Sequence, residues 1–303
     1  MANPIIEDFK SKMRNGNPIS RLILINVAVF LFVSVFRIIS FLSGESSMIV
    51  AIEDFIKSNL ALPLSFQGLI LKPWTLITYM FTHFSLIHIF WNLITLYWFG
   101  DLFINYTNSK KLIPIYLLCG IAGALIAIAL FTLIPQFQVY LGAPMIGASA
   151  GVTAIIVATA TLIPNVNMNM LFIGPVKLLY VALFVIFIDI LNVASYDNVG
   201  GNLSHLGGAL MGFIFIIQYK KGNDLSKGIT KFFDWITGIF KSGPKSKMKV
   251  AYKRKVSDED YNYNKKMEQE TIDKILDKIS KSGYESLSKT EKEILFKASG
   301  KKK

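Results

Sequence analysis

Six long apolar stretches dominate this sequence and leave few folds open to it. They run over residues 19–42, 84–104, 112–134, 149–163, 176–192 and 203–219. A helix needs about 20 residues to cross the hydrocarbon core of a bilayer; the first three stretches reach that length, whereas the fourth and the sixth are short. Only 17% of the residues are charged, against about 25% in soluble domains. The sequence therefore predicts an all-α polytopic membrane protein with six helices.

The basic residues are distributed unevenly. Residues 1–219 hold ten Lys/Arg and eight Asp/Glu, whereas residues 220–255 hold eleven and two. A basic segment directly after the last apolar helix predicts attraction to anionic lipid of the cytoplasmic leaflet. Nucleic acid is the weaker interpretation of the same charge, and we expect no nucleic-acid partner. The single Cys119 excludes a disulfide framework and a cysteine-based zinc site.

Lysines and arginines in the short loops predict the orientation, because cytoplasmic loops carry an excess of them. One side of the six stretches holds Lys10, Lys12, Arg14, Arg21, Lys110, Lys111, Lys177 and the basic tail. The other side holds Lys57 and Lys72, both in the long first loop. We therefore expect a multi-pass protein of the cell membrane with both termini in the cytoplasm. The stretches 84–104, 149–163 and 203–219 would then begin at the extracytoplasmic side.

The remaining segments complete the expected domain organisation. Residues 1–18 form a cytoplasmic N-terminal segment that lacks the pattern of a cleaved signal, and residues 19–219 form the six-helix core. Within that core, the half-apolar first loop 43–83 is expected to lie in the membrane interface, with Trp74 and Tyr79 at headgroup level.

The C-terminal part divides into two segments. Residues 220–255 form the basic juxtamembrane segment, which includes a surface helix over 227–241 that ends before Pro244. Residues 256–303 form a small charged, soluble helical module. Its two helices are expected over Glu268–Ile279 and Lys289–Lys297, joined around Gly283, and no catalytic motif is found in them.

Polar residues inside the apolar core are the candidates for function, because ionisable groups in a membrane are costly. His88 and Asn92 are spaced i, i+4 and share one helix face. Ser149 opens the fourth stretch, and His205 lies in the first turn of the sixth. All four residues therefore fall at the extracytoplasmic ends of their helices. His83 lies at the junction before the second stretch, where we interpret it as a structural hydrogen-bonding residue.

These residue types form a set for acyl transfer. A serine hydroxyl becomes a nucleophile when a base takes its proton, and histidine is the usual base. The oxyanion that forms needs preorganised donors. We therefore expect Ser149 to be the nucleophile, His205 the general base, and His88 and Asn92 the oxyanion stabilisers. Backbone N–H groups at the start of the fourth stretch would add donors.

Small residues predict that the fourth and sixth helices pack closely. One stripe of the sixth stretch contains Gly201, His205, Gly208 and Gly212, and one row of the fourth contains Ala150, Ala154 and Ala158. Their contact would bring His205 towards Ser149. Because the fourth stretch is too short to span the hydrocarbon core, Ser149 should lie below the membrane surface in a cavity that admits water.

The chain resembles the rhomboid intramembrane serine proteases. The matching motifs are His88-x-x-x-Asn92, Gly147-Ala148-Ser149, and Gly201-x-x-x-His205-x-x-Gly208-x-x-x-Gly212, and they cover the core of about residues 20–219. The resemblance implies a six-helix rhomboid bundle and a Ser149–His205 dyad, with His88 and Asn92 at the oxyanion. It also implies cleavage of transmembrane helices near their extracytoplasmic ends, without a metal or another cofactor. Single-span membrane proteins are the expected substrates.

The sequence departs from the family pattern in three places. Ala150 follows the serine where the family most often has glycine, and Thr75 follows Trp74 where many members have arginine. Thr153 occupies the place, one turn after the serine, of a tyrosine that often supports the histidine ring. The sequence thus leaves open which group orients His205.

Asp189, near the extracytoplasmic end of the fifth stretch, is one candidate for that role, as the acid of a triad. Because the resemblance implies a dyad without an acid, we interpret Asp189 as a structural hydrogen-bonding residue. Arg37 and Lys177 lie near the ends of stretches and can extend to the interface.

Two other functions were weighed against the protease. A catalytically silent rhomboid-like protein would bind membrane helices without cutting them, but it should lack part of the Ser149–His205 pair, which is complete here. A transporter or channel should show repeated halves or charged residues at mid-membrane, and neither is found. A metal site is not expected, because the three histidines share no motif with a carboxylate.

Overall fold

The computed structural model describes residues 11, 16–44, 46–170, 173–240 and 258–300. The chain divides into two compact units, residues 1–242 and 243–303. Two predicted features fall outside the described residues: most of the N-terminal segment, up to residue 15, and the part of the basic segment that contains Pro244.

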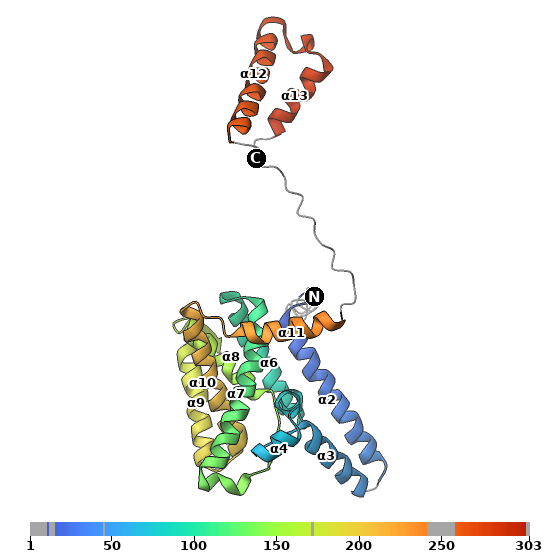
Figure 1. Ribbon diagram of the computed structural model, residues 1–303, viewed down its shortest axis with the longest axis vertical. Helices are drawn as coiled ribbons and strands as arrows, with labels where there is room; N and C mark the ends of the chain where they lie inside the picture. Colours follow the sequence, from blue (N-terminus) through green and yellow to red (C-terminus); the bar gives the residue numbers. More distant parts are fainter. Residues whose placement is uncertain (1–10, 12–15, 45, 171–172, 241–257, 301–303) are drawn as a thin grey trace. The chain divides into compact units, whose positions relative to one another are not determined.

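Helices make up most of the first unit (Figure 1). Its α-helices are α2 (Pro18–Leu42), α3 (Ser46–Leu60), α4 (Phe66–Leu71), α5 (Thr75–Thr78), α6 (Leu86–Tyr106), α7 (Leu112–Leu133), α8 (Ser149–Leu162), α9 (Leu178–Ala194), α10 (Val199–Lys220) and α11 (Ser226–Phe240). Its 3-10 helices are η1 (Tyr79–Phe81), η2 (Ser109–Lys111) and η3 (Pro135–Tyr140), and its short strands are β1 (Leu62–Pro63), β2 (Pro144–Met145), β3 (Asn167–Met170) and β4 (Gly174–Lys177).

Four helices of the described residues have the length and composition of membrane spans: α2, α6, α7 extended by η2, and α10. The apolar helices α8 and α9 are shorter, with 14 and 17 residues. The expectation that the sixth stretch is short was wrong, because α10 has 22 residues. Its extra turn, Val199–Asn202, contains two glycines that carry no apolar side chain. Crossings by α8 and α9 stay a prediction.

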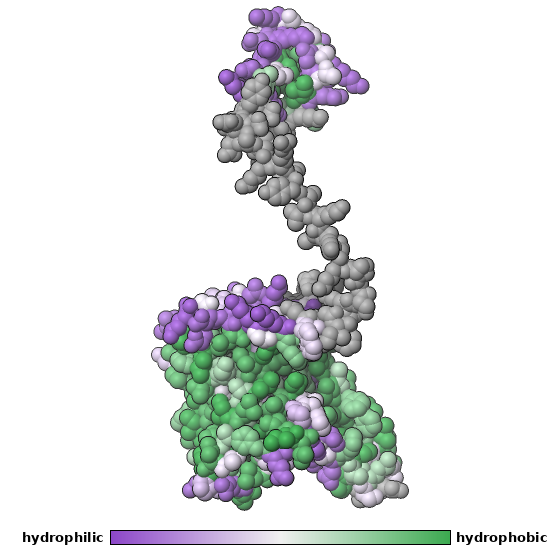
Figure 2. Space-filling view, in the orientation of Figure 1, coloured by the Kyte–Doolittle hydropathy of each residue, from purple (hydrophilic) through white to green (hydrophobic). Residues whose placement is uncertain are grey.

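The surface of the first unit supports insertion in a bilayer. Figure 2 shows an apolar band across the visible face of this unit, with polar residues along its upper and lower edges. Large apolar side chains of α2 and α9 contribute to the exposed surface, among them Phe32, which is 58% exposed, and Phe184, which is 63% exposed. In water such a surface would cause association, whereas lipid chains solvate it.

α8 lies at the centre of this unit, in contact with α6, α7, α9 and α10. Every residue from Ala150 to Ala160 is buried. The predicted packing of α8 on α10 is confirmed at Gly208 and Gly212, because a Cβ at Gly212 would lie 2.5 Å from the carbonyl oxygen of Ala154. Gly201, which the prediction placed in the same stripe, lies instead against the side chain of Asn198.

The segment between α2 and α6 is folded into short elements rather than a free loop. β1 pairs with β2 in antiparallel register, with Leu62 opposite Met145. The indole N–H of Trp74 donates to the carbonyl of Asn59, and the Trp74 side chain is half-exposed. Tyr79 was expected at headgroup level, and this was wrong: it is 1% exposed and its hydroxyl donates to the carbonyl of Gly120.

The surface helix predicted over 227–241 is present as α11, which lies crosswise to the spanning helices in Figure 1. Asp224 caps its N-terminus, because one carboxylate oxygen accepts from both the N–H and the hydroxyl of Ser226. The other carboxylate oxygen lies 2.6 Å from the ammonium of Lys111. The first turn of α11 is therefore attached to the connection between α6 and α7.

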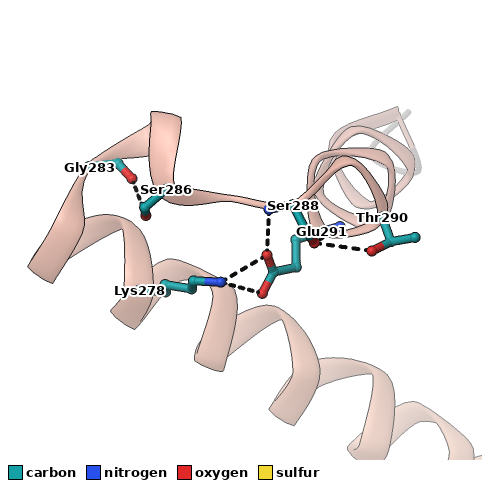
Figure 3. A network of polar contacts seen from close by, with 6 residues as sticks. All are labelled: Lys278, Gly283, Ser286, Ser288, Thr290 and Glu291. Atoms are coloured by element: carbon teal, nitrogen blue, oxygen red, sulfur yellow. Dashed lines mark hydrogen bonds and ion pairs between the residues drawn. The ribbon is translucent and has the colours of Figure 1, made fainter.

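The second unit contains α12 (Asp258–Ser282), η4 (Tyr284–Ser286) and α13 (Lys289–Gly300). α12 begins ten residues before the predicted Glu268, in a polar stretch with no apolar periodicity. Glu291 accepts from the N–H of Ser288 at 2.7 Å, and the Ser288 hydroxyl accepts from the N–H of Glu291 at 3.3 Å (Figure 3). This reciprocal pair is a capping box. Lys278 of α12 contacts both Glu291 oxygens at 3.0 Å and joins the two helices.

Candidate active site

Ser149 and His205 form a direct hydrogen bond between two helices. Oγ of Ser149, the first residue of α8, lies 2.6 Å from Nε2 of His205 in the first half of α10. Both side chains are partly buried, and the imidazole is 16% exposed. The close contact of α8 with α10 at Gly208, three residues after His205, holds the two groups at this distance.

The second nitrogen of His205 contacts a carboxylate. Nδ1 lies 2.8 Å from Oδ1 of Asp189 in α9, and Asp189 is 5% exposed. A carboxylate only accepts hydrogen bonds, so Nδ1 carries the proton in the neutral ring. Nε2 is then the acceptor and faces the hydroxyl of Ser149. This is the tautomer that a general base for Ser149 requires.

The imidazole of His88 lies beside Ser149. A Cβ built at Gly147 would lie 3.0 Å from Nε2 of His88 and 3.5 Å from Oγ of Ser149, so both groups border the same small space. Gly147 has a φ of +121°, a conformation that favours glycine. Only a residue without a side chain lets the 146–148 backbone pass between His88 and Ser149.

Asn92 lies one turn after His88 and is 6% exposed. Its amide nitrogen donates to the carbonyl oxygen of His88 at 3.0 Å and lies 3.4 Å from Nε2 of His83. The sequence correctly places Asn92 on the face of His88. In this structure its amide hydrogens point to these two acceptors, and the contact to His83 is the longer one.

His83 connects the His88–Asn92 face to the start of α8. Its Nε2 accepts from the backbone N–H of Ala148 at 3.3 Å, and its ring centroid lies 5.0 Å from that of His88. Burial, together with the neighbouring His88, lowers the pKa of His83 to about 4. Because Nε2 faces two donors, only the neutral ring fits. His83 is thus a hydrogen-bonding residue at the loop–helix junction, as the sequence predicts.

Backbone donors lie next to the serine as well. The first four N–H groups of a helix have no partner within it, and the hydrogen-bond ladder of α8 begins with the N–H of Val152, which donates to Ala148. The N–H groups of Gly147 and Ala148 are occupied by Tyr79 and His83. The N–H of Ser149 and those just after it are therefore the backbone groups positioned to meet an oxyanion.

A cavity of about 360 Å³ opens beside His88. Its lining includes His88, Tyr140, Met145, Tyr196, Asn198 and Gly201. Tyr196 and Asn198 have φ angles of 57° and 40°, in the left-handed region that costs energy for residues other than glycine. The turn between α9 and α10 is thus held in an unusual conformation where it borders this cavity.

The donor set does not resemble a metal site. Among the described residues, no group of three or more His, Cys, Asp or Glu side chains could hold a metal ion. Cys119 is buried in the core. The histidines at this end of the unit pair instead with serine, aspartate, asparagine and backbone groups.

Comparisons with known proteins identify the family to which the core of the chain is similar. Residues 71–221 match the family model described as the rhomboid domain, and residues 256–301 match a family of unknown function, DUF6576. RHOMBOID-like protein 12, mitochondrial, of Arabidopsis thaliana is 30% identical over 161 residues. That match covers 49% of this chain and 47% of the relative, so it spans about half the length of each protein.

Proposed function

This chain belongs to the rhomboid family, and we propose that it is an intramembrane serine endopeptidase. Its apolar helices and its family identify a membrane protein of rhomboid type. The activity proposed here is hydrolysis of peptide bonds in or near the transmembrane helices of other membrane proteins. The single observation that carries this proposal is the 2.6 Å contact between Oγ of Ser149 and Nε2 of His205.

The proposed reaction begins with attack by Ser149 on the carbonyl carbon of the scissile bond. The O–H bond breaks, its proton passes to Nε2 of His205, and the carbonyl electron pair moves onto oxygen. The resulting imidazolium then donates that proton to the leaving amine as the C–N bond breaks. A water molecule then gives a proton to Nε2 of His205 and attacks the carbonyl carbon of the acyl-enzyme. The bond between that carbon and Oγ of Ser149 breaks, and His205 returns the proton to Oγ.

His88 and Asn92 are proposed as donors to the oxyanion, with the N–H of Ser149. His88 supports this role by its position across Gly147 from Oγ. To act as a donor, Asn92 would redirect one amide hydrogen towards the oxyanion. That hydrogen would leave His83, the more distant of its two acceptors. Each preorganised donor in such a site contributes about 10²–10³ in rate.

The depth of the site favours membrane substrates. α8 has 14 residues and is about 21 Å long at 1.5 Å per residue, whereas the hydrocarbon core is about 30 Å thick. If α8 ends at the inner face, Ser149 lies below the outer one, at the level of a substrate helix end. We therefore propose single-span membrane proteins as substrates, cut near the extracytoplasmic end, with both termini of the enzyme in the cytoplasm.

Anionic lipid is proposed as a second partner. α11 carries Lys227 and Lys231, both exposed, at the end of the unit that holds Lys110 and Lys111. Each basic residue near an anionic surface contributes about 1 kcal/mol to binding. This contact would hold α11 on the cytoplasmic leaflet of the cell membrane.

The test is cleavage of purified single-span substrates in lipid by the wild type and by Ser149→Ala. We expect cleavage by the wild type that a chelator leaves unchanged, and a loss of at least about 10³-fold in Ser149→Ala and in His205→Ala. A fluorophosphonate should label Ser149 in the wild type. If no substrate is cut and no label is incorporated, the chain is instead a catalytically silent relative that binds membrane helices.

A further inference from the structure

Asp189 is an acidic residue inside an apolar helix. It lies near the C-terminal end of α9, in the sequence Ile186-Phe187-Ile188-Asp189-Ile190, and is 5% exposed. A carboxylate at such a position is costly unless it has a partner. Among the described residues, Nδ1 of His205 is its hydrogen-bond partner, and Oδ2 has none. The hydrogen bond with Nδ1 of His205 therefore offsets part of the unfavourable free energy of burying the Asp189 carboxylate.

We propose that Asp189 is the positioning residue of His205, so that the site works as a Ser149–His205–Asp189 triad rather than as a dyad. This inference rests on the proposed protease function. Asp189 does not touch the substrate. It acts through Nδ1 of His205, which it holds in one tautomer and one ring orientation.

The two hydrogen bonds of the His205 imidazole select one tautomer and one ring orientation. A neutral imidazole has two tautomers, and its ring can be turned by half a rotation. The ionised carboxylate accepts from Nδ1–H, which leaves the lone pair of Nε2 directed at the hydroxyl of Ser149. A donor in place of Asp189 would favour the opposite tautomer, in which Nε2 carries a proton and cannot accept one.

The same contact stabilises the charge that forms during the reaction. When His205 takes the proton of Ser149, the imidazolium keeps its Nδ1–H at 2.8 Å from the carboxylate. Charges at this separation interact more strongly in a poorly solvated site than in water.

Among the described residues, Asp189 is the only side chain that hydrogen-bonds to Nδ1 of His205. Thr153, one turn after Ser149, is buried in α8, and among the described residues no hydrogen bond joins it to His205. Both ring nitrogens already have partners, which are Ser149 and Asp189. The place that a supporting aromatic ring takes in many relatives is thus served here by a carboxylate from the next helix.

The experiment compares Asp189→Asn with Asp197→Asn in the full-length protein. Asp197 is exposed in the turn after α9 and receives the same change without touching His205. For Asp189→Asn we expect kcat to fall by about 10²- to 10⁴-fold with KM little changed. The rate of fluorophosphonate labelling at Ser149 should fall in parallel, and Asp197→Asn should match the wild type.

A structural role and a positioning role differ in pH dependence. Asp189→Asn removes the negative charge beside the imidazole, so the kcat–pH profile of this variant should differ in shape from that of the wild type. Asp189→Glu keeps the charge with displaced oxygens, so it should recover part of the rate that Asp189→Asn loses. It also reports on positioning if the Asn variant does not fold.

Two outcomes separate this inference from the proposed function. If the wild type cleaves and Asp189→Asn does so within threefold of it with the same pH profile, Asp189 is structural and the dyad interpretation stands. The same conclusion follows if Asp189→Glu is no better than Asp189→Asn. If neither the wild type nor any variant cleaves or takes up the label, the protease function itself is wrong.

Discussion

Gly208 of α10 lies against the carbonyl oxygen of Ala150 in α8, so closely that a side chain at this position would overlap the backbone. Gly208 follows His205 by three residues, and Ala150 follows Ser149 directly. The distance between the two helices therefore sets the distance between the two reactive groups. Close packing of small residues on two helices, rather than a loop, positions the imidazole of His205 on the hydroxyl of Ser149.

Gly208→Ala should separate α8 from α10 and reduce cleavage by at least about 100-fold, because a displacement of 1 Å at the reacting atoms costs about that much. Overpacking should also lower the free energy of unfolding by about 1–3 kcal/mol. Gly228→Ala in α11 is the matched control, since nothing lies within 4 Å of its Cβ position. Activity of Gly208→Ala close to that of Gly228→Ala would show that the helices can repack.

His83 should make stability depend on pH. Its pKa in the folded protein is about 4, below the ordinary 6.5, so between these values the unfolded chain binds a proton that the folded chain does not. Stability from this group is complete above pH 6.5 and falls as the pH drops towards 4, by about 3 kcal/mol in total. His83→Gln has no imidazole to protonate, so its stability should fall less between pH 6.5 and 4 than that of the wild type. Parallel unfolding curves for the two proteins between pH 7 and 4 would contradict the prediction.

Arg37 should hold the first loop more firmly than Lys57 does. Its guanidinium donates to the carbonyl oxygen of Phe84 at 2.9 Å and lies 3.1 Å from Glu53. Lys57 pairs with Glu53 at 3.2 Å and meets Phe84 only through the face of its ring, 5.9 Å from the centroid. Arg37→Met should lower the free energy of unfolding by about 1–3 kcal/mol, and Lys57→Met by less than about 1 kcal/mol. Thermal unfolding in detergent measures both, and equal shifts would argue against a role for the Phe84 contact.

Glu291 should slow the local opening of the first turn of α13 in the C-terminal unit. Hydrogen bonds from the backbone and the hydroxyl of Ser288, then from Lys278, lower its pKa from 4.5 to about 2. The stabilisation is therefore complete above pH 4.5 and is lost as the pH falls towards 2. Glu291→Gln should speed hydrogen exchange of the first turn of α13 at neutral pH. Glu285→Gln, which removes only an exposed contact with Lys292, serves as the control and should leave the exchange unchanged.

Substrate helices that unwind easily should be cut faster, since a carbonyl must leave its helical hydrogen bond to reach Ser149. Two Ala→Gly changes near the outer end of a substrate helix weaken it by about 2 kcal/mol, which limits the gain in rate to roughly 30-fold. The measurement compares the cleavage rates of two substrates that differ only by alanine or glycine at these two positions, at equal concentration. A rate indifferent to these changes would mean that unwinding does not limit cleavage.

Much of the site could be predicted from spacing along single helices. His88 and Asn92 share a face because they are four residues apart, and Ser149 opens α8 as predicted. His205 was expected in the first turn of its helix, and this was wrong, because α10 begins at Val199 and His205 is its seventh residue. Helix ends were harder to place: α10 begins earlier than its apolar run because Gly200, Gly201 and Asn202 add a turn without adding hydrophobicity. Tyr79 was misplaced because aromatic residues suit both interfaces and cores.

The sequence did not predict which groups the ionisable residues contact. Arg37 lies near the end of its apolar stretch and can extend to the interface, and the sequence did not indicate that it binds Glu53 and the carbonyl of Phe84. The family pattern, a dyad without an acid, favours a structural role for Asp189, whereas its carboxylate contacts Nδ1 of His205. Its burial within an apolar helix was the available signal, and the absence of the usual tyrosine at Thr153 was a second one.

The chain's hydropathy, helix lengths and motif spacing were enough to infer a membrane bundle with its reactive groups at one depth, because these properties depend on residues close together in sequence. Which side of α9 faces α10 could not be inferred in this way. That helix is apolar from Leu178 to Ile188, and its polar side chains Asp189 and Asn192 both lie near its C-terminal end, so no periodicity along the helix marks its buried face. The rotation of α9 that places Asp189 on His205 depends on how side chains of α8, α9 and α10 interlock, and such contacts exist only in the assembled bundle.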